Sequence, residues 1–305
     1  FTSVFYAGLA GLLSGGLLYA ILLGARCCQA AIMSATSPAT AAYAADHTTP
    51  DQRIRAMARL GTANSMGTIL GPAVSGALAA LGLLAPLYFA AGLAAAAALL
   101  IWWQLPLTPP RDLTRRHSST HLRYTDPRIV TYLATSVGLF VGYSGIQQTL
   151  GFQLQDKLAL DGIETAQMTG AALMVSAAFT FIVQMTVMQR LNLRPIQFMR
   201  FGLAALLAGS VIICGFSSFA LLAPGMACLG AGLGLCMPAI YSGASLAVTP
   251  EEQGGAAGLV SACPAIGFVA GPLCAGALYQ IDGLLAPLFS ATVFALVLAL
   301  LMFRE

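Results

Sequence analysis

Apolar segments long enough to cross a lipid bilayer follow one another along almost the whole chain. A bilayer core of about 30 Å requires about 20 helical residues, and short connections separate segments of about that length here. The ten segments lie at 1–14, 17–45, 58–81, 84–105, 129–155, 166–190, 199–216, 218–247, 255–280 and 284–303. The sequence therefore predicts an all-α polytopic membrane protein, whose first segment is too short to span.

Charged residues make up only 8% of the 305 residues, and hydrophobic residues make up 58%. Soluble domains carry about 25% charged residues, so a fold of this composition would present an apolar exterior to water. Lipid is therefore the expected solvent. The 7 cysteines all fall in apolar segments and show no metal-ligand spacing, so we expect small packing residues and neither disulfides nor a metal.

The basic residues predict the orientation of the segments. Of 14 Lys and Arg residues, all except Arg26 and Lys157 fall on one side when the segments alternate in direction. Cytoplasmic connections are enriched in Lys and Arg, so this side is expected to be cytoplasmic. It includes the chain's C-terminus and the polar, Pro-rich linker at 106–128. The opposite connections hold Lys157 together with four acidic residues, Asp156, Asp161, Glu164 and Asp282.

An internal repeat recurs at a spacing of 200 residues. The pattern Gly67-x3-Gly71-Pro72-x3-Gly76 returns as Gly267-x3-Gly271-Pro272-x3-Gly276, and three further matches keep almost the same offset. Parallel repeats of this kind are an architecture of secondary transporters. We therefore expect two six-helix halves related by a pseudo-two-fold axis: an incomplete first half at 1–105, with about four helices, and a complete second half at 129–305. About ten of twelve helices would be present, and because residue 1 is Phe we expect the rest upstream.

Two motifs resemble those of the major facilitator superfamily. Arg26-x2-Gln29, followed by Pro38 and Asp46, is similar to the Arg-containing motif of the fourth helix in that superfamily. The Gly67–Gly76 pattern resembles the fifth-helix motif of its drug:proton antiporter branch, which includes tetracycline exporters. The resemblance implies a major facilitator fold and proton-coupled export.

Residues with a coupling or gating role are expected in these motifs. Arg26 is the only basic residue embedded in a segment, and an ionisable group there is expensive in free energy, which indicates function. A structural role, with the guanidinium reaching the interface or helix carbonyls, is the alternative. The glycines would form a tight, hinged seal or would simply allow close helix packing. The predicted coupling residues are Arg26, Gln29, Asp46, Gly67, Gly71, Pro72 and Gly76.

Polar residues in the middle of apolar segments are the candidates for a substrate cavity. They are Asn64, Tyr143, Gln147, Gln148, Gln184 and Tyr241. Few hydrogen-bonding groups in an apolar pocket suit an amphipathic or hydrophobic solute. A hydrogen bond between helices is an equally good explanation for each of them.

These observations predict a proton-coupled exporter of small amphipathic compounds in a bacterial inner membrane. A solute importer of the same fold is the main alternative, followed by a non-transporting membrane protein. An enzyme is not expected, because all 3 histidines lie in connections. We expect no cofactor, a proton gradient as the energy source, no nucleic-acid partner and a monomer. Because no acidic residue lies deep in a segment, the proton carrier is expected either in the upstream helices or to be absent.

Overall fold

The computed structural model describes residues 15–34, 36, 39–40, 43, 67, 71, 74–78, 81–82, 84–104, 122–191, 193–249 and 252–303. Regular structure within these ranges is entirely helical. The chain divides into two compact units, residues 1–108 and 109–305, and each is described by itself. The predictions made for Asp46, Asn64 and Pro72 lie outside the described residues.

The first unit contains two long apolar helices, α2 (Gly15–Ser34) and α5 (Ala85–Gln104). Neither helix has a buried residue. Helix α5 contains no charged side chain, and α2 contains one, Arg26. The sequence predicted a segment at 84–105, within one residue of α5 at each end. It predicted a longer segment at 17–45, of which α2 covers the first part.

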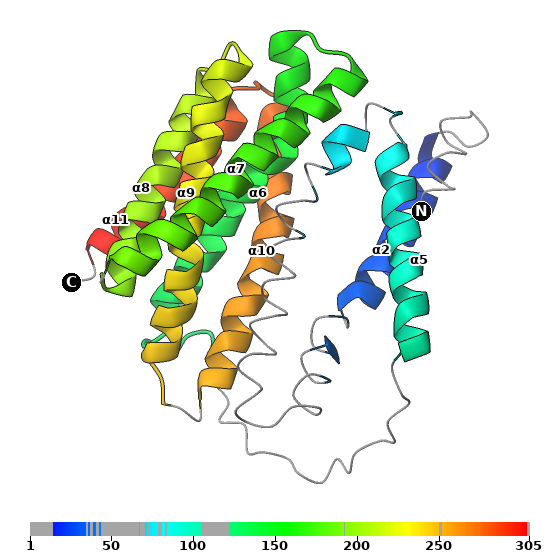
Figure 1. Cartoon of the computed structure of the whole chain (residues 1–305). Coiled ribbons are helices and arrows are strands. Elements are labelled where there is room, and N and C mark those ends of the chain that lie inside the picture. Colours follow the sequence, from blue (N-terminus) through cyan, green and yellow to red (C-terminus); the bar gives the residue numbers. More distant parts are fainter. Residues whose placement is uncertain are drawn as a thin grey trace. The chain divides into compact units, whose positions relative to one another are not determined.

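The second unit is a bundle of six helices within residues 122–303 (Figure 1). Each helix runs antiparallel to the one before it, so basic residues near the start of α6, the end of α7 and the start of α8 share one end of the bundle. The helices are α6 (Val130–Leu158), α7 (Gly162–Arg190), α8 (Pro195–Cys214), α9 (Phe219–Leu246), α10 (Gln253–Tyr279) and α11 (Leu285–Met302).

Local signals set the starts of α7 and α8 four residues before the predicted apolar segments. Asp161 caps α7 by accepting a 2.7 Å hydrogen bond from the backbone N–H of Glu164. The Glu164 carboxylate in turn accepts a hydrogen bond from the backbone N–H of Asp161. This reciprocal pair satisfies two donors that a helix start leaves unpaired. Helix α8 has Pro195 in its first turn, where the missing N–H costs nothing. Hydropathy alone does not register a cap residue or a proline in the first turn.

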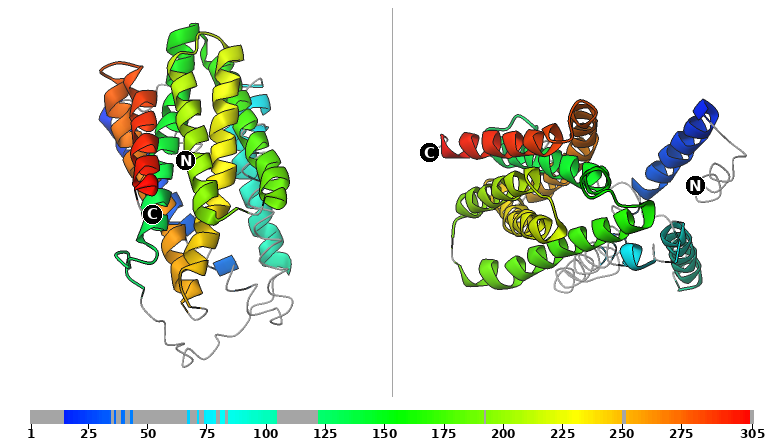
Figure 2. Two further views of the ribbon diagram at one scale, coloured as in Figure 1. Left: turned by 90° about the vertical axis from the view of Figure 1, so that its left-hand side faces the viewer. Right: turned by 90° about the horizontal axis from the view of Figure 1, so that it is seen from above.

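Small residues let the helices of the bundle approach closely. Helix α8 packs most extensively on α9, and α7 lies obliquely across α9 (Figure 2). A Cβ added to Gly202 would lie 2.8 Å from the carbonyl oxygen of Gly232, and one on Gly209 would lie 2.7 Å from that of Gly225. Association of helices in lipid depends on such close packing, because lipid tails are as apolar as the side chains.

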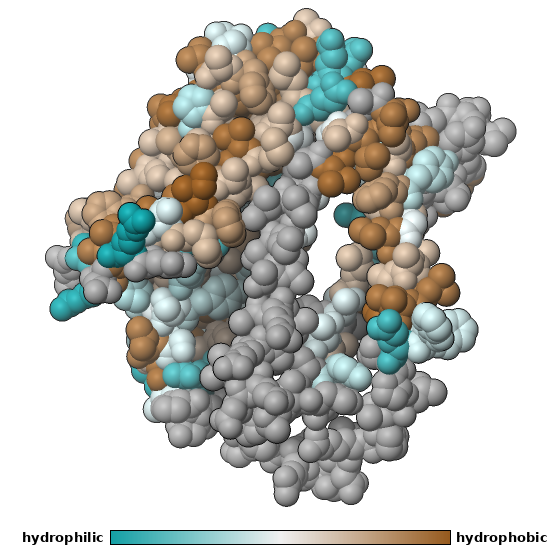
Figure 3. Space-filling model, viewed as in Figure 1, coloured by the Kyte–Doolittle hydropathy of each residue, from teal (hydrophilic) through white to brown (hydrophobic). Residues whose placement is uncertain are grey.

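Seven of the described helices are long and apolar enough to cross a membrane. Apolar side chains cover much of the flank of the bundle, and the most polar groups lie toward its ends (Figure 3). Helix α6 is long enough but is less apolar, because it carries buried Thr135, Ser136, Ser144, Thr149 and Gln153. Polar residues in a spanning helix normally face the protein interior, so α6 is the natural place to look for a site.

Candidate functional site

The second copy of the Gly–Pro motif lies against α6. A Cβ at Gly267 would lie 2.7 Å from the carbonyl carbon of Phe140, and one at Gly271 would lie 3.1 Å from the amide nitrogen of Gly145. Ser144 donates a buried 2.9 Å hydrogen bond to the carbonyl oxygen of Gly267. These contacts are with backbone atoms, so the two helices could not accept larger residues here without moving apart.

One helical turn further on, the same two helices separate into a groove of about 520 Å³. Pro272 and Gly276 belong to the motif and form part of its wall. Among the described residues, no atom lies within 4 Å of a Cβ built on Gly276, so the absence of a side chain there leaves space in the groove. The complete lining is Gln148, Thr149 and Phe152 from α6, with Pro272, Gly276, Tyr279 and Gln280 from α10 and its end.

The rim of the groove combines two aromatic rings with a carboxylate. Phe152 and Tyr279 have ring centroids 6.0 Å apart, with 40° between their planes. The Tyr279 hydroxyl donates a hydrogen bond to Oδ2 of Asp156, which is one turn beyond Phe152 on α6. Neighbouring Lys157 is held elsewhere: its Nζ donates to the carbonyl oxygen of Cys214 at 3.0 Å and lies over the Phe216 ring. Among these described contacts, the charged group joined to the aromatic rim is therefore the Asp156 carboxylate and not Lys157.

The opposite ends of α6 and α10 are joined by an ion-pair cluster. Arg128 donates to both carboxylate oxygens of Glu252, at 2.9 and 3.1 Å, and to both oxygens of Asp126. These charge-assisted hydrogen bonds, with Arg128 as the largest cause, lower the pKa of the Glu252 and Asp126 carboxyls below their ordinary values. The cluster thus fixes α6 to α10 at the basic end of the bundle.

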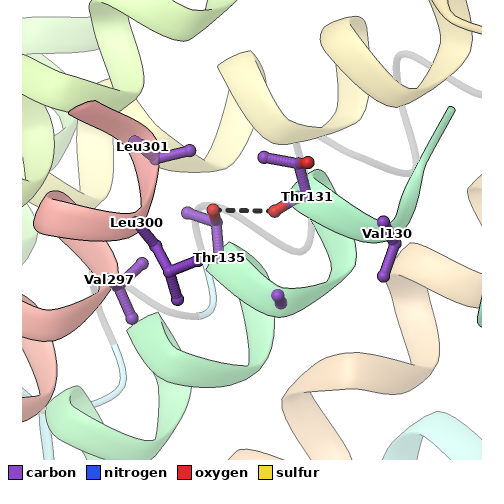
Figure 4. A pocket seen from close by; sticks show the side chains of 7 residues that line it. Val130, Thr131, Thr135, Val297, Leu300 and Leu301 are labelled. Atoms are coloured by element: carbon purple, nitrogen blue, oxygen red, sulfur yellow. Dashed lines mark hydrogen bonds between the residues drawn. The ribbon is translucent and has the colours of Figure 1, made fainter. Parts of the chain in front are cut away.

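A second pocket, between the start of α6 and the end of α11, is apolar (Figure 4). Its volume is about 170 Å³. Thr135 donates its hydroxyl to the backbone oxygen of Thr131, 2.8 Å away in its own helix. The other lining residues are Val130, Ala134, Val297, Leu300 and Leu301. This pocket offers little for recognising a polar solute.

The described coupling candidates all belong to the first unit. Arg26 donates a 2.8 Å hydrogen bond from Nη1 to Oε1 of Gln29, one turn along α2. Within the described residues, no atom lies within 4 Å of a Cβ built on Gly67 or Gly71, whereas Gly76 is buried. The Arg26–Gln29 pairing is local geometry, and the coupling role of these residues stays a prediction.

The cavity candidates do not gather in a single pocket. Gln148 lines the groove. Tyr143 and Gln147 lie half-buried on α6, and the Gln147 Oε1 atom is buried without a hydrogen-bond partner among the described residues. Gln184 lies half-buried on α7, and Tyr241 on α9 has its hydroxyl 3.3 Å from that of Ser261 on α10. Tyr241 thus makes an interhelical contact of the kind named as the alternative.

The groove contains residues that the sequence analysis passed over: Thr149, Phe152, Tyr279 and Gln280. The i, i+4 spacing of Gln148 and Phe152 places them on one face of α6, which is a signal available from the sequence. No comparable local pattern brings α10 to that face, because the two sides of the groove are at least 120 residues apart in the chain.

Comparisons with known proteins identify the family and the fold of the chain. The family model of the Major Facilitator Superfamily matches residues 1–263 and, in a second match, 188–305. No curated protein matches the chain. Among solved structures, the crystal structure of the human organic anion transporter MFSD10 (TETRAN) is similar, with a TM-score of 0.59 and 23% identity. The similarity covers 86% of this chain and 66% of that one. The chain is an integral membrane protein that belongs to the Major Facilitator Superfamily, a family of transporters.

Proposed function

We propose that this chain belongs to a secondary active transporter that exports small amphipathic or hydrophobic compounds in exchange for protons. The observation that carries the proposal is the groove between α6 and α10, in which Gln148, Tyr279 and Gln280 provide polar groups beside the Phe152 ring. Apolar surface with a few polar groups is typical of small-molecule sites. Membership of the superfamily supports transport, and alternating access of two six-helix halves is part of the proposal.

Proton-coupled export is proposed from the motifs. The Gly67–Gly76 pattern of the first repeat resembles that of drug:proton antiporters, and Arg26 adds a charge to an otherwise uncharged helix. Retaining a charge in a membrane helix requires compensation, which favours a role in coupling. We propose the proton gradient of a bacterial inner membrane as the energy source, with no cofactor.

Organic anions are the competing substrate class. MFSD10 is an organic anion transporter, and its structure resembles this chain. The groove argues for a different class here, because the hydroxyl of Tyr279, which lines it, is hydrogen-bonded to the Asp156 carboxylate. Both classes belong in the test.

Inverted inner-membrane vesicles containing the full-length protein provide that test. The vesicles are energised with a proton gradient, and lipophilic cations, tetracyclines, organic anions and neutral amphiphiles are added in turn. We expect uptake into the vesicles together with substrate-dependent proton release, and neither in vesicles without the protein. Uptake into intact cells with no response in vesicles would instead establish an importer.

A further inference from the structure

We propose that the α6–α10 groove contains a binding subsite for organic cations, formed by Phe152, Tyr279 and Asp156. The inference rests on the proposed function, because it names the substrate class that the transporter would carry. The subsite lies at the end of the bundle opposite the basic residues, where α6 and α10 both finish.

The two aromatic rings provide the first element of the subsite. Phe152 is 59% exposed although it lies in a helix that packs against α10 and α11. Its ring is inclined at 40° to that of Tyr279, so the pair does not stack and ring surface stays accessible. Aromatic faces attract quaternary ammonium and similar cations through the ring quadrupole.

The carboxylate provides the second element. Tyr279 binds only Oδ2 of Asp156, and Oδ1 makes no hydrogen bond within the described part of the chain. The hydroxyl thus orients the carboxylate beside the rings and leaves one oxygen for a ligand. An anionic ligand would meet the Asp156 charge, whereas a cation gains from both the carboxylate and the rings.

The basic side chain next to Asp156 in the sequence, Lys157, contacts other partners. Lys157 follows Asp156 in sequence, but its Nζ contacts Cys214, the last residue of α8, and Phe216, in the connection to α9. The lysine could have neutralised the carboxylate, but its Nζ is instead hydrogen-bonded to a backbone carbonyl. The negative charge at the rim is therefore left for a ligand.

Two ions of nearly the same shape and opposite charge test the subsite: tetraphenylphosphonium and tetraphenylborate. Their binding to full-length protein in nanodiscs is measured at equilibrium, with binding to empty nanodiscs subtracted. We expect the cation to bind and the anion to bind at least about tenfold more weakly. Asp156→Asn should weaken cation binding about tenfold, and Phe152→Leu, which does not disturb the carboxylate, about threefold.

Asp282→Asn is the matched control. Asp282 is at the same end of the bundle, and its Oδ1 accepts a hydrogen bond from the Leu284 backbone N–H, a role that Asn retains. We expect wild-type cation binding from this variant. Equal weakening by Asp156→Asn and Asp282→Asn would indicate general surface charge and overturn the subsite, as would equal binding of the two ions.

The subsite and the proposed function can fail separately. Asp156-dependent cation binding without proton release in vesicles would support the subsite and contradict coupled export. Substrate-dependent proton release with unchanged cation binding by Asp156→Asn would support export and overturn the subsite.

Discussion

The two copies of the internal repeat keep the same glycines but differ where the first copy carries charge. Gly67 and Gly71 return as Gly267 and Gly271. At the same offset of 200, Arg26 and Gln29 are replaced by Met226 and Leu229. In α9 these two side chains belong to the core, with 1% and 0% of their surface exposed. In α2, Arg26 and Gln29 are exposed and hydrogen-bonded to each other.

This difference distinguishes the residues that pack helices together from the residues that are candidates for a role in transport. The repeated glycines have a direct explanation in the second copy, where they bring α10 against the backbone of α6. The Arg–Gln pair is not repeated, and packing in α9 is achieved without it. Because Met226 stands at the position of the second repeat that corresponds to Arg26, the helix itself does not require the charge. Arg26 is therefore a stronger candidate for a transport role than the repeated glycines.

The largest expected effect on stability is at Gly271. Gly271→Leu would place a side chain against backbone atoms of α6, and overpacking of this kind costs about 1–3 kcal/mol or more. We expect a clear decrease in the apparent melting temperature of the purified full-length protein. Gly276→Leu is the control, because no atom of the described residues lies within 4 Å of a Cβ built on Gly276. An unchanged melting temperature for Gly271→Leu would contradict the close α6–α10 contact.

The corresponding change in the first copy sharpens the comparison. Gly71→Leu is expected to block transport or to make the vesicles leaky to protons, because the antiporter-like motif is proposed to seal the transporter. Proton leak and substrate uptake are measured in the same vesicles. A tight, normally transporting variant would leave only the packing explanation for the first copy.

Ser144→Ala removes the buried hydrogen bond to Gly267 and should have a smaller effect. Interhelical hydrogen bonds in membranes are worth about 0.6 kcal/mol on average, and buried ones about 0.5–1.5 kcal/mol in general. We expect a modest decrease in melting temperature. Thr292→Ala is a suitable control, since Thr292 is exposed and its hydroxyl bonds only to its own helix. An effect as large as that of Gly271→Leu would show that the contact depends on the bond more than on shape.

The smallest effect is expected from the ion pairs at the basic end. The pKa of the Glu252 carboxyl is lowered in the folded protein, so its contribution to stability is present above the ordinary pKa of 4.5 and is lost as pH falls through the lowered value. Glu252→Gln should remove part of this pH dependence of the melting temperature. The same pH profile in wild type and variant would mean that the cluster does not stabilise the α6–α10 contact.

Much of the helical architecture could be predicted from hydropathy and the placement of basic residues. The predicted segment at 218–247 matches α9 within one residue at each end, because its boundaries coincide with a change in polarity. The starts of α7 and α8 were missed, since the Asp161 cap of α7 and the first-turn Pro195 of α8 are signals that hydropathy does not register. Gln148 was predicted as a cavity residue, but Tyr279 and Asp156 were not. Their contact depends on how α10 crosses α6, which no local pattern encodes.

The most direct test of the account measures exchange in proteoliposomes containing purified full-length protein. Wild type is compared with Arg26→Ala, with Arg26→Met, which copies the second repeat, and with Met226→Leu, a volume-conserving change in the core. We predict substrate-dependent proton exchange by wild type and Met226→Leu, and its loss in both Arg26 variants despite normal insertion. Wild-type exchange by Arg26→Met would contradict the proposal that Arg26, which the second repeat lacks, has a role in transport.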